Sequence, residues 1–290
     1  MKMKMMKKWI SIFFAVPLIL IIWGCEQEKK ETPTKGYVKC LVDESLINVM
    51  EDERKQFLDL YQDTKIDLQI VKAREGIAAV LNGEAKMFIS SRALNSEERE
   101  FIQKTKSDAT VFKFCLDGLI VIANLGCPVD SIKIDELNDI LLGKNKNYKI
   151  FLPEANTGIY EVVKNDFLGG KDPAGGNILN SEKDVIQKVT NTKNSLGLVG
   201  LNPLRDNKRV KILKVGSSGN AFVKSAFYEP IPGYLVNGSY PLVRTTYIIL
   251  NEVGLKVASG FTAFLTSYEG QKIVLKNNLG PATVPVKLRQ

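Results

Sequence analysis

Short apolar runs alternate with amphipathic segments along most of the chain. Residues 37–42 (YVKCLV), 65–71 (KIDLQIV) and 86–90 (KMFIS) have the aliphatic and β-branched content of buried strands. Between them, residues 51–61 and 75–83 carry apolar side chains at helical spacing. Strands that alternate with helices in this way predict an α/β fold built on a parallel sheet.

Two apolar runs are longer than an ordinary strand. They span residues 111–124 and 240–252, and they bracket a middle block with an α/β pattern of its own. We therefore expect two α/β lobes joined by two crossing strands, with a ligand held between them where strand ends meet helix N-termini. The remaining predicted elements are helices at 95–104, 131–144, 158–170, 181–191 and 254–277 and strands at 148–152 and 195–201.

The N-terminus has the pattern of a secretory signal. Four lysines within the first eight residues precede an apolar run from Trp9 to Trp23, which is short for a membrane-spanning helix. The run ends at Gly24-Cys25, which is similar to a bacterial lipobox, where the cysteine is lipidated and the signal is removed. We expect a lipoprotein signal peptide at 1–24 with lipid on Cys25; a plain N-terminal membrane anchor is the alternative.

The segment after the signal is charged, contains proline and lacks apolar periodicity, so residues 25–36 are expected to form a flexible tether. The implied layout is an exported, lipid-anchored domain that faces the periplasm or the cell surface. Within that domain we predict lobe I at 37–118 and 245–290 and lobe II at 119–244.

Charge and cysteine content exclude several function classes. The chain has 40 Lys+Arg and 32 Asp+Glu; without the four signal lysines the balance is 36 against 32, or +4, with no basic tract typical of nucleic-acid binding. Histidine is absent, and Cys40, Cys115 and Cys127 form no CxxC pair, so no metal site or cofactor is expected. With three such cysteines at least one thiol is unpaired, and a disulfide between the other two stays open.

Ser90, Ser91 and Arg92 follow directly on a predicted strand and precede a predicted helix. Hydroxyls, backbone N–H groups and a guanidinium at such a point can hold an oxyanion. The alternative is an ordinary turn with a surface arginine. A serine nucleophile is disfavoured because the chain has no histidine, no G-x-S-x-G elbow and no Ser-x-x-Lys motif to activate a hydroxyl.

Six segments occur in the order found in periplasmic phosphate-binding proteins of ABC importers. They are GIAAVLNGEAKMFISSRALNSEE, LDGLIVIAN, IKIDELNDILLGK, SLGLVGLNPL, YPLVRTTYII and FLTSYEGQKIVLKNNLG. The chain resembles this family over residues 37–285, and VDES at 42–45 looks like a variant start found in lipoproteins of the Bacteroidetes type. The resemblance implies a two-lobed, type II-like substrate-binding fold with two hinge strands and a cleft that closes on its ligand.

The resemblance also implies which residues bind the ligand. In lobe I it points to hydroxyls, a glycine and arginines: Ser45, Arg74, Gly76, Ser90, Ser91 and Arg92. The equivalent loop of lobe II is LPEANTGIY (152–160), where Asn156, Thr157 and Gly158 are the expected binding residues.

The lobe II loop departs from the family pattern. Pro153 stands where the family has an arginine, and Ile159 replaces a threonine. Loss of a charged donor costs roughly 1.5–3 kcal/mol per charge-assisted hydrogen bond to a buried anion. Asp43 and Glu44 beside the first loop further disfavour a dianion, unless one of them accepts a ligand proton.

From these patterns we expect a monomeric solute-binding lipoprotein, with no catalytic residues, that captures phosphate or a related oxyanion and delivers it to an ABC permease in the inner membrane. One alternative is a degenerate member of the same fold that senses, or binds a ligand other than phosphate. A second is an exported hydrolase; turnover of a phosphoester that Ser90→Ala abolishes would support it.

Overall fold

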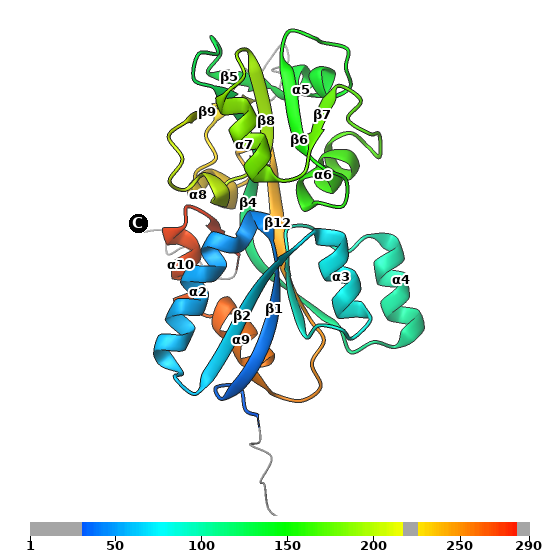
Figure 1. Cartoon of the computed structure of the whole chain (residues 1–290), viewed down its shortest axis with the longest axis vertical. Coiled ribbons are helices and arrows are strands. Elements are labelled where there is room, and N and C mark those ends of the chain that lie inside the picture. The colour runs from blue at the N-terminus through cyan, green and yellow to red at the C-terminus, as the bar shows by residue number, and fades with distance from the viewer. Residues whose placement is uncertain (1–30, 217–225, 283–290) are drawn as a thin grey trace, which may run out of the picture. The chain divides into compact units, whose positions relative to one another are not determined.

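The computed structural model describes residues 31–216 and 226–282 (Figure 1). Thr32–Gln290 form one compact unit, distinct from Met1–Glu31. The predicted signal peptide and Cys25 lie outside the described residues. Over the described ranges, none of the helices combines the length and the apolar character that a membrane crossing needs.

Lobe I contains three parallel strands, and the central one pairs with both of the others. Helices cover this part of the sheet (Figure 1). The strands are β1 (Gly36–Asp43), β2 (Thr64–Val71) and β3 (Met87–Ser90), and the helices are α2 (Ile47–Leu60), α3 (Ala73–Leu81), α4 (Ser96–Thr105), α9 (Val257–Thr266) and α10 (Tyr268–Lys276). A 3-10 turn, η1 (Glu44–Leu46), connects β1 to α2.

Two long strands link the lobes. β12 (Val243–Leu250) pairs antiparallel with β3 and with the first half of β4 (Thr110–Asn124). The second half of β4 pairs antiparallel with β8 (Ser195–Gly200) in lobe II. The strand order is therefore β2-β1-β3-β12-β4-β8, and the sheet is mixed rather than parallel as predicted, because β12 runs opposite to β3 and β4, and β4 in turn runs opposite to β8.

Lobe II continues this sheet with strands parallel to β8 and adds a small second sheet. Its other strands are β5 (Ser131–Lys133), β6 (Lys149–Pro153), β7 (Gly176–Leu179), β9 (Val210–Ile212), β10 (Lys214–Gly216) and β11 (Phe227–Tyr228); its helices are α5 (Ile134–Leu141), α6 (Gly158–Val162), α7 (Glu182–Thr190) and α8 (Pro232–Val236). The two-lobed α/β fold is confirmed, whereas the exact lobe boundaries stay a prediction.

Three predicted helices differ from the structure. The segment 131–144 starts as strand β5, because Ile132 is buried and pairs with β10 before α5 begins. The segment 254–277 forms two helices separated by Ser267, whose backbone is extended and whose hydroxyl accepts from Gly270 N at 3.4 Å. The α-helix predicted at 158–170 ends at Val162 and continues as a short π-helical turn.

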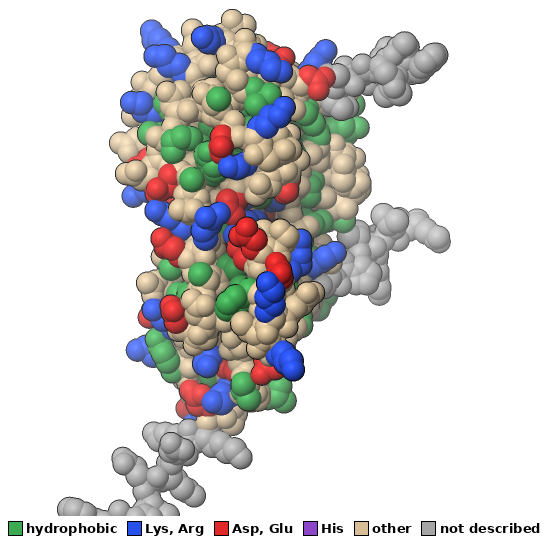
Figure 2. Space-filling model, turned by 90° about the vertical axis from the view of Figure 1, so that its right-hand side faces the viewer, with side chains coloured by type: hydrophobic (Ala, Val, Ile, Leu, Met, Phe, Trp, Pro, Cys, Tyr) green, Lys and Arg blue, Asp and Glu red, His purple; other side chains and the backbone are tan. Residues whose placement is uncertain are grey.

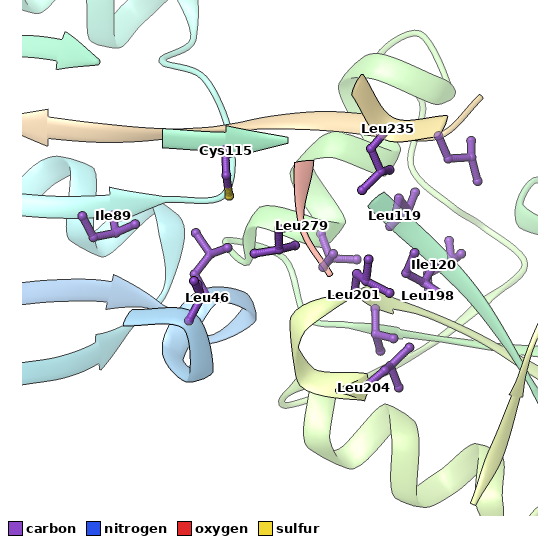
Figure 3. Close-up of a cluster of buried hydrophobic side chains, with 14 of the residues drawn as sticks. Leu46, Ile89, Cys115, Leu119, Ile120, Leu198, Leu201, Leu204, Leu235 and Leu279 are labelled. Atoms are coloured by element: carbon purple, nitrogen blue, oxygen red, sulfur yellow. The ribbon is translucent and has the colours of Figure 1, made fainter. Parts of the chain in front are cut away.

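One hydrophobic cluster runs through both lobes. The cluster includes Leu46, Ile89 and Cys115. It also includes Leu119, in the second half of β4, and Leu198, in β8 (Figure 3). Cys40, Cys115 and Cys127, for which the sequence leaves one disulfide open, are all buried free thiols. Because the core is continuous along β4, the strand holds the facing loops of the two lobes in register.

Candidate functional site

Buried polar residues from both lobes meet where the strands of lobe I end. Asp43 ends β1, Ser45 lies in η1 and Ser91 follows β3, while Gly158 begins α6 and Glu182 begins α7 from lobe II. All five are buried. Loops at the carboxyl ends of strands are where α/β folds place their ligands. These loops therefore form the candidate site.

Ser91 of lobe I and Gly158 of lobe II lie against each other. A Cβ built on Gly158 would lie 1.7 Å from Ser91 Oγ and 3.1 Å from Asp43 Oδ2. Ser91 Oγ is fully buried and has no hydrogen-bond partner among the residues that the structure describes. A buried hydroxyl without a partner is rare and costly, which makes it a candidate donor to a ligand.

The Ser45 hydroxyl lies between two carboxyl groups. Its Oγ is 2.8 Å from Asp43 Oδ1 and 2.5 Å from Glu182 Oε1. Glu182 Oε2 also accepts from Gly200 N at 2.6 Å, and Glu182 N donates to Glu44 Oε1 at 3.1 Å. The side chain of Glu182 therefore connects lobe II to the first loop of lobe I.

A buried ion pair lies in the linking strands beside these groups. Arg244 of β12 donates to Asp117 Oδ2 of β4 through Nη2 at 2.5 Å and Nε at 3.1 Å. Its third nitrogen, Nη1, is buried and has no partner within residues 31–216 and 226–282. A Cβ on Gly200 would lie only 2.6 Å from Arg244 Nη2, so the guanidinium reaches the end of β8. Burial acts to lower the pKa of Arg244, but Asp117 and the other nearby carboxylates raise it overall, so this cation keeps its charge.

The sequence interpretation missed Arg244, Asp117 and Glu182 as site residues. A signal was nevertheless present, because a single acid and a single guanidinium interrupt the apolar parts of two long strands. The two residues are direct partners across the β4–β12 ladder. Opposite charges in the two strands predicted to cross between the lobes were therefore the signal for a buried pair.

Arg92 forms ion pairs with two carboxylates of the protein. Its guanidinium binds both carboxylate oxygens of Glu98 at 2.8 and 2.7 Å, and it also pairs with Glu161 of lobe II. Ser90 Oγ donates to the carbonyl oxygen of Arg92 at 2.8 Å, inside the turn. The structure thus places Arg92 as a bridge between the lobes, and the ligand roles of Ser90 and Arg92 stay predictions.

The other predicted residues lie around the site. The Arg74 side chain is 63% exposed and pairs with Glu161 at 3.3 Å, and Arg74 N donates to the carbonyl oxygen of the exposed Asn156 at 3.3 Å. Gly76 packs α3 against Phe88, because a Cβ there would come within 2.5 Å of the ring. The ligand roles of Arg74, Gly76 and Asn156 therefore stay predictions.

Thr157 caps the helix that faces the site. Its Oγ1 donates to Glu154 O at 2.7 Å and accepts from Tyr160 N at 3.3 Å. The hydroxyl is thereby committed to shaping the turn that leads into α6. Any direct role of Thr157 or Gly158 in ligand binding stays a prediction.

Charged side chains gather at the level where the lobes meet, on the face formed by α3, α4 and α6 (Figure 2). A cavity of about 740 Å³ on this face includes Arg74, Arg92, Asn156 and Glu161 among its lining residues. Lys72 of lobe I also forms an ion pair with Glu154 of lobe II, at 2.7 Å. These ion pairs bring the two rims of the cleft together outside the buried site.

The buried carboxyl groups are strongly perturbed. Burial raises the pKa of Glu182 to about 8 and that of Glu44 to about 7. Within the part of the chain that the structure describes, no group of three or more Asp, Glu, Cys or His residues is arranged to hold a metal ion. The site as built offers hydrogen-bond donors from Ser91 and Arg244 beside protonatable acceptors.

Comparison with known proteins agrees with this architecture. The phosphate-binding protein PstS of Borreliella burgdorferi is 26% identical over 290 residues, covering 93% of this chain and 96% of that protein. PstS of Staphylococcus saprophyticus is 23% identical over 287 residues, covering 90% and 85%. These matches confirm the resemblance expected from the six segments.

A solved structure has the same fold. A phosphate ABC transporter substrate-binding protein of Clostridium perfringens, described as putative and with bound phosphate, superposes with a TM-score of 0.73 at 21% identity, covering 85% of this chain and 100% of that one. The model of the PBP superfamily domain matches residues 27–269, which is most of the chain. The chain therefore belongs to the PBP superfamily of two-lobed binding proteins.

Proposed function

We propose that this protein is the solute-binding component of an ABC importer and that its solute is phosphate or a closely related oxyanion. The observation that carries the proposal is the pair of buried donors without a partner among the described residues, Ser91 Oγ and Arg244 Nη1. A dehydrated oxyanion needs donors of this kind, one of them cationic. The relatives named as phosphate-binding proteins support the choice of solute.

Arg244 offers an answer to the missing arginine of the lobe II loop. Pro153 ends β6 without a charged side chain, whereas Arg244 brings a buried guanidinium from the linking strand β12. One of its nitrogens is uncommitted among the described residues. A charge-assisted donor can therefore reach the site from the hinge instead of from the loop.

The mechanism would be capture followed by closure of the lobes, with no covalent step. The Ser91 hydroxyl and Arg244 would replace hydration of the oxyanion, and Asp43 Oδ2, close to Gly158, would accept a hydrogen bond from an O–H group that the solute retains. An acceptor at this point favours an oxyanion that keeps an O–H group over one that is fully ionised. A hydrolase is not proposed, because among the described residues Ser91 Oγ has no hydrogen-bond partner and Ser90 Oγ donates to the carbonyl oxygen of Arg92, and because the chain has no histidine.

We further propose that the protein is exported and held at the membrane by lipid on Cys25, so that the compact unit works as a monomer beside its permease. The lipobox-like Gly24-Cys25 supports this location. Mass spectrometry of the protein from membranes would test it; an unmodified Cys25 with residues 1–24 still attached would refute it.

Removal of the Ser91 hydroxyl tests the proposed site. Ser91→Ala should weaken phosphate binding about 10- to 150-fold, because one hydrogen bond to a buried anion, worth about 1.5–3 kcal/mol, is lost. Ser195→Ala is the matched control: Ser195 is buried as well, but its hydroxyl donates to Thr192 O at 2.7 Å in lobe II. Equilibrium dialysis with labelled phosphate gives both affinities. An unchanged affinity of Ser91→Ala would place the anion elsewhere.

A second candidate is a member of the fold that senses a ligand other than phosphate. It is favoured by the number of carboxyl groups around Arg244: Asp43, Asp117 and Glu182 all act on its charge. Such a site suits a neutral or protonated ligand better than a dianion. Binding of no inorganic oxyanion, with an intact fold, would favour this candidate.

A further inference from the structure

The Glu182 side chain joins the two lobes through direct hydrogen bonds. It extends from the first residue of α7, is 2% exposed and places its carboxyl group between Ser45 of lobe I and Gly200 of lobe II. Oε1 lies 2.5 Å from Ser45 Oγ and Oε2 accepts from Gly200 N at 2.6 Å. A hydroxyl and a backbone N–H are groups that could serve a solute, and here they bind a side chain of the protein.

Hydrogen counting assigns a proton to this contact. The Ser45 hydroxyl has one hydrogen, yet its oxygen is within hydrogen-bonding distance of both Asp43 Oδ1 and Glu182 Oε1. Ionised carboxylates only accept, so one of the two carboxyl groups must donate to Ser45 Oγ. Asp43 Oδ1 already accepts from Ser45 N at 3.0 Å, so this oxygen is placed as an acceptor. The donor is therefore Glu182, in the chain Glu182 Oε1–H to Ser45 Oγ–H to Asp43 Oδ1.

The surrounding charges agree with this assignment. Acidic groups face Glu182 from η1 and the end of β1, and Arg244 faces it from β12 while paired with Asp117 of β4: the charged groups are Glu44, Asp43, Arg244 and Asp117. Burial is the largest cause that raises the pKa of Glu182 to about 8, and Glu44 adds to it whereas Arg244 opposes it. Glu44, whose own pKa is raised to about 7 mainly by burial, accepts from Glu182 N.

We propose that protonated Glu182 is a latch that holds the lobes closed in the solute-free protein, so that the cleft opens as the pH rises. The proposal rests on the proposed function only in taking the protein to be one whose lobes open and close. In the open form, water would reach the carboxyl group and its pKa would return towards the ordinary value of 4.5.

The sign of the pH effect follows from this difference. The closed form binds the proton more tightly, so the latch is at full strength below the ordinary pKa and is lost as the pH rises through about 8. Because one proton is involved, the equilibrium constant between the closed and open forms changes by at most about tenfold per pH unit. Because solute enters only the open form, the latch also slows association at the acidic end of this range.

The test is small-angle X-ray scattering of the solute-free fragment Thr32–Gln290, the compact unit, between pH 6 and pH 9. The wild-type radius of gyration should rise with pH. Glu182→Gln should stay compact throughout, since its amide can donate to Ser45 and accept from Gly200 at any pH. Glu182→Ala should be expanded throughout. Glu154→Gln, which removes the rim pair with Lys72, is the control and should keep the wild-type pH response.

A pH-independent wild-type radius, or a Glu182→Gln radius that follows the wild type, would overturn the latch. Circular dichroism on each variant confirms that the fold is intact. Addition of phosphate at pH 9 separates this proposal from the proposed function. Compaction by phosphate without a pH response would refute the latch alone, whereas a pH response without compaction by phosphate would refute phosphate as the solute and leave the latch standing.

Discussion

Gly158→Ala is the substitution whose effect the structure defines most sharply. The new Cβ would lie 1.7 Å from Ser91 Oγ, and contacts below 3.0 Å force a movement, so the two groups must separate by at least 3.0 − 1.7 = 1.3 Å. Rotation of the Ser91 hydroxyl relieves this contact but leaves the new Cβ only 3.0 Å from Ser91 Cβ and 3.1 Å from Asp43 Oδ2, so either the hydroxyl is turned away or the lobes close incompletely, and both weaken binding through Ser91. Overpacking of this kind costs typically 1–3 kcal/mol, which corresponds to about a 5- to 150-fold loss of affinity when closure and binding are coupled.

The assay is calorimetric titration with phosphate, combined with thermal unfolding. Gly233→Ala in α8 is the matched control, because a Cβ there meets no atom within 4 Å, and its affinity should equal that of the wild type. Ser91→Ala combined with Gly158→Ala removes the atom responsible for the 1.7 Å contact and should recover closure without recovering the lost hydroxyl. If Gly158→Ala alone bound phosphate as tightly as the wild type, the closed arrangement of Ser91 against Gly158 would not be the binding form.

Two further predictions concern buried charges. Asp117→Asn leaves the guanidinium of Arg244 buried without its counter-ion and should lower the free energy of unfolding by about 3–5 kcal/mol in urea titrations. The control is Asp52→Asn, which breaks the half-exposed pair with Arg205 and should cost at most about 1 kcal/mol. Equal losses for the two variants would contradict the account. Glu53 is buried, and neither of its carboxyl oxygens is hydrogen-bonded to a described residue. Burial raises its pKa from the ordinary 4.5 to about 9, so the folded state loses stability as the pH rises between these two values. Glu53→Met should flatten the fall in unfolding free energy between pH 6 and pH 9, and an unchanged slope would exclude Glu53 as its source.

Much of the fold follows from local patterns in the sequence. Ser181 caps α7 as its Ser-x-x-Asp start predicts, with Ser181 Oγ accepting from Asp184 N at 3.1 Å. Asn95 likewise completes a capping box with Glu98 at the start of α4. The direction of β12 could not be predicted, because alternation and apolar content do not distinguish parallel from antiparallel pairing. For the same reason the break at Ser267 was missed: apolar spacing continued across it.

The site was only partly predictable. Ser45, Ser91 and Gly158 come together because they end strands or begin helices that face one cleft, which the order of elements indicates. Arg244 and Asp117 lie 127 positions apart, and only the register of two long strands joins them. For Arg92 the sequence pattern suggested a ligand anion, but in the structure its guanidinium pairs with the carboxylates of Glu98 and Glu161.

The central claim is that the closed cleft holds an oxyanion through Ser91 and Arg244. Its most direct test is calorimetric titration of the fragment Thr32–Gln290 with phosphate, arsenate, sulfate and molybdate in turn. We expect one-to-one binding of phosphate, competition by arsenate, and much weaker binding of sulfate and molybdate, because those two lack an O–H group that could donate a hydrogen bond to Asp43. Heat from none of the four anions, with a folded protein in the cell, would contradict the account.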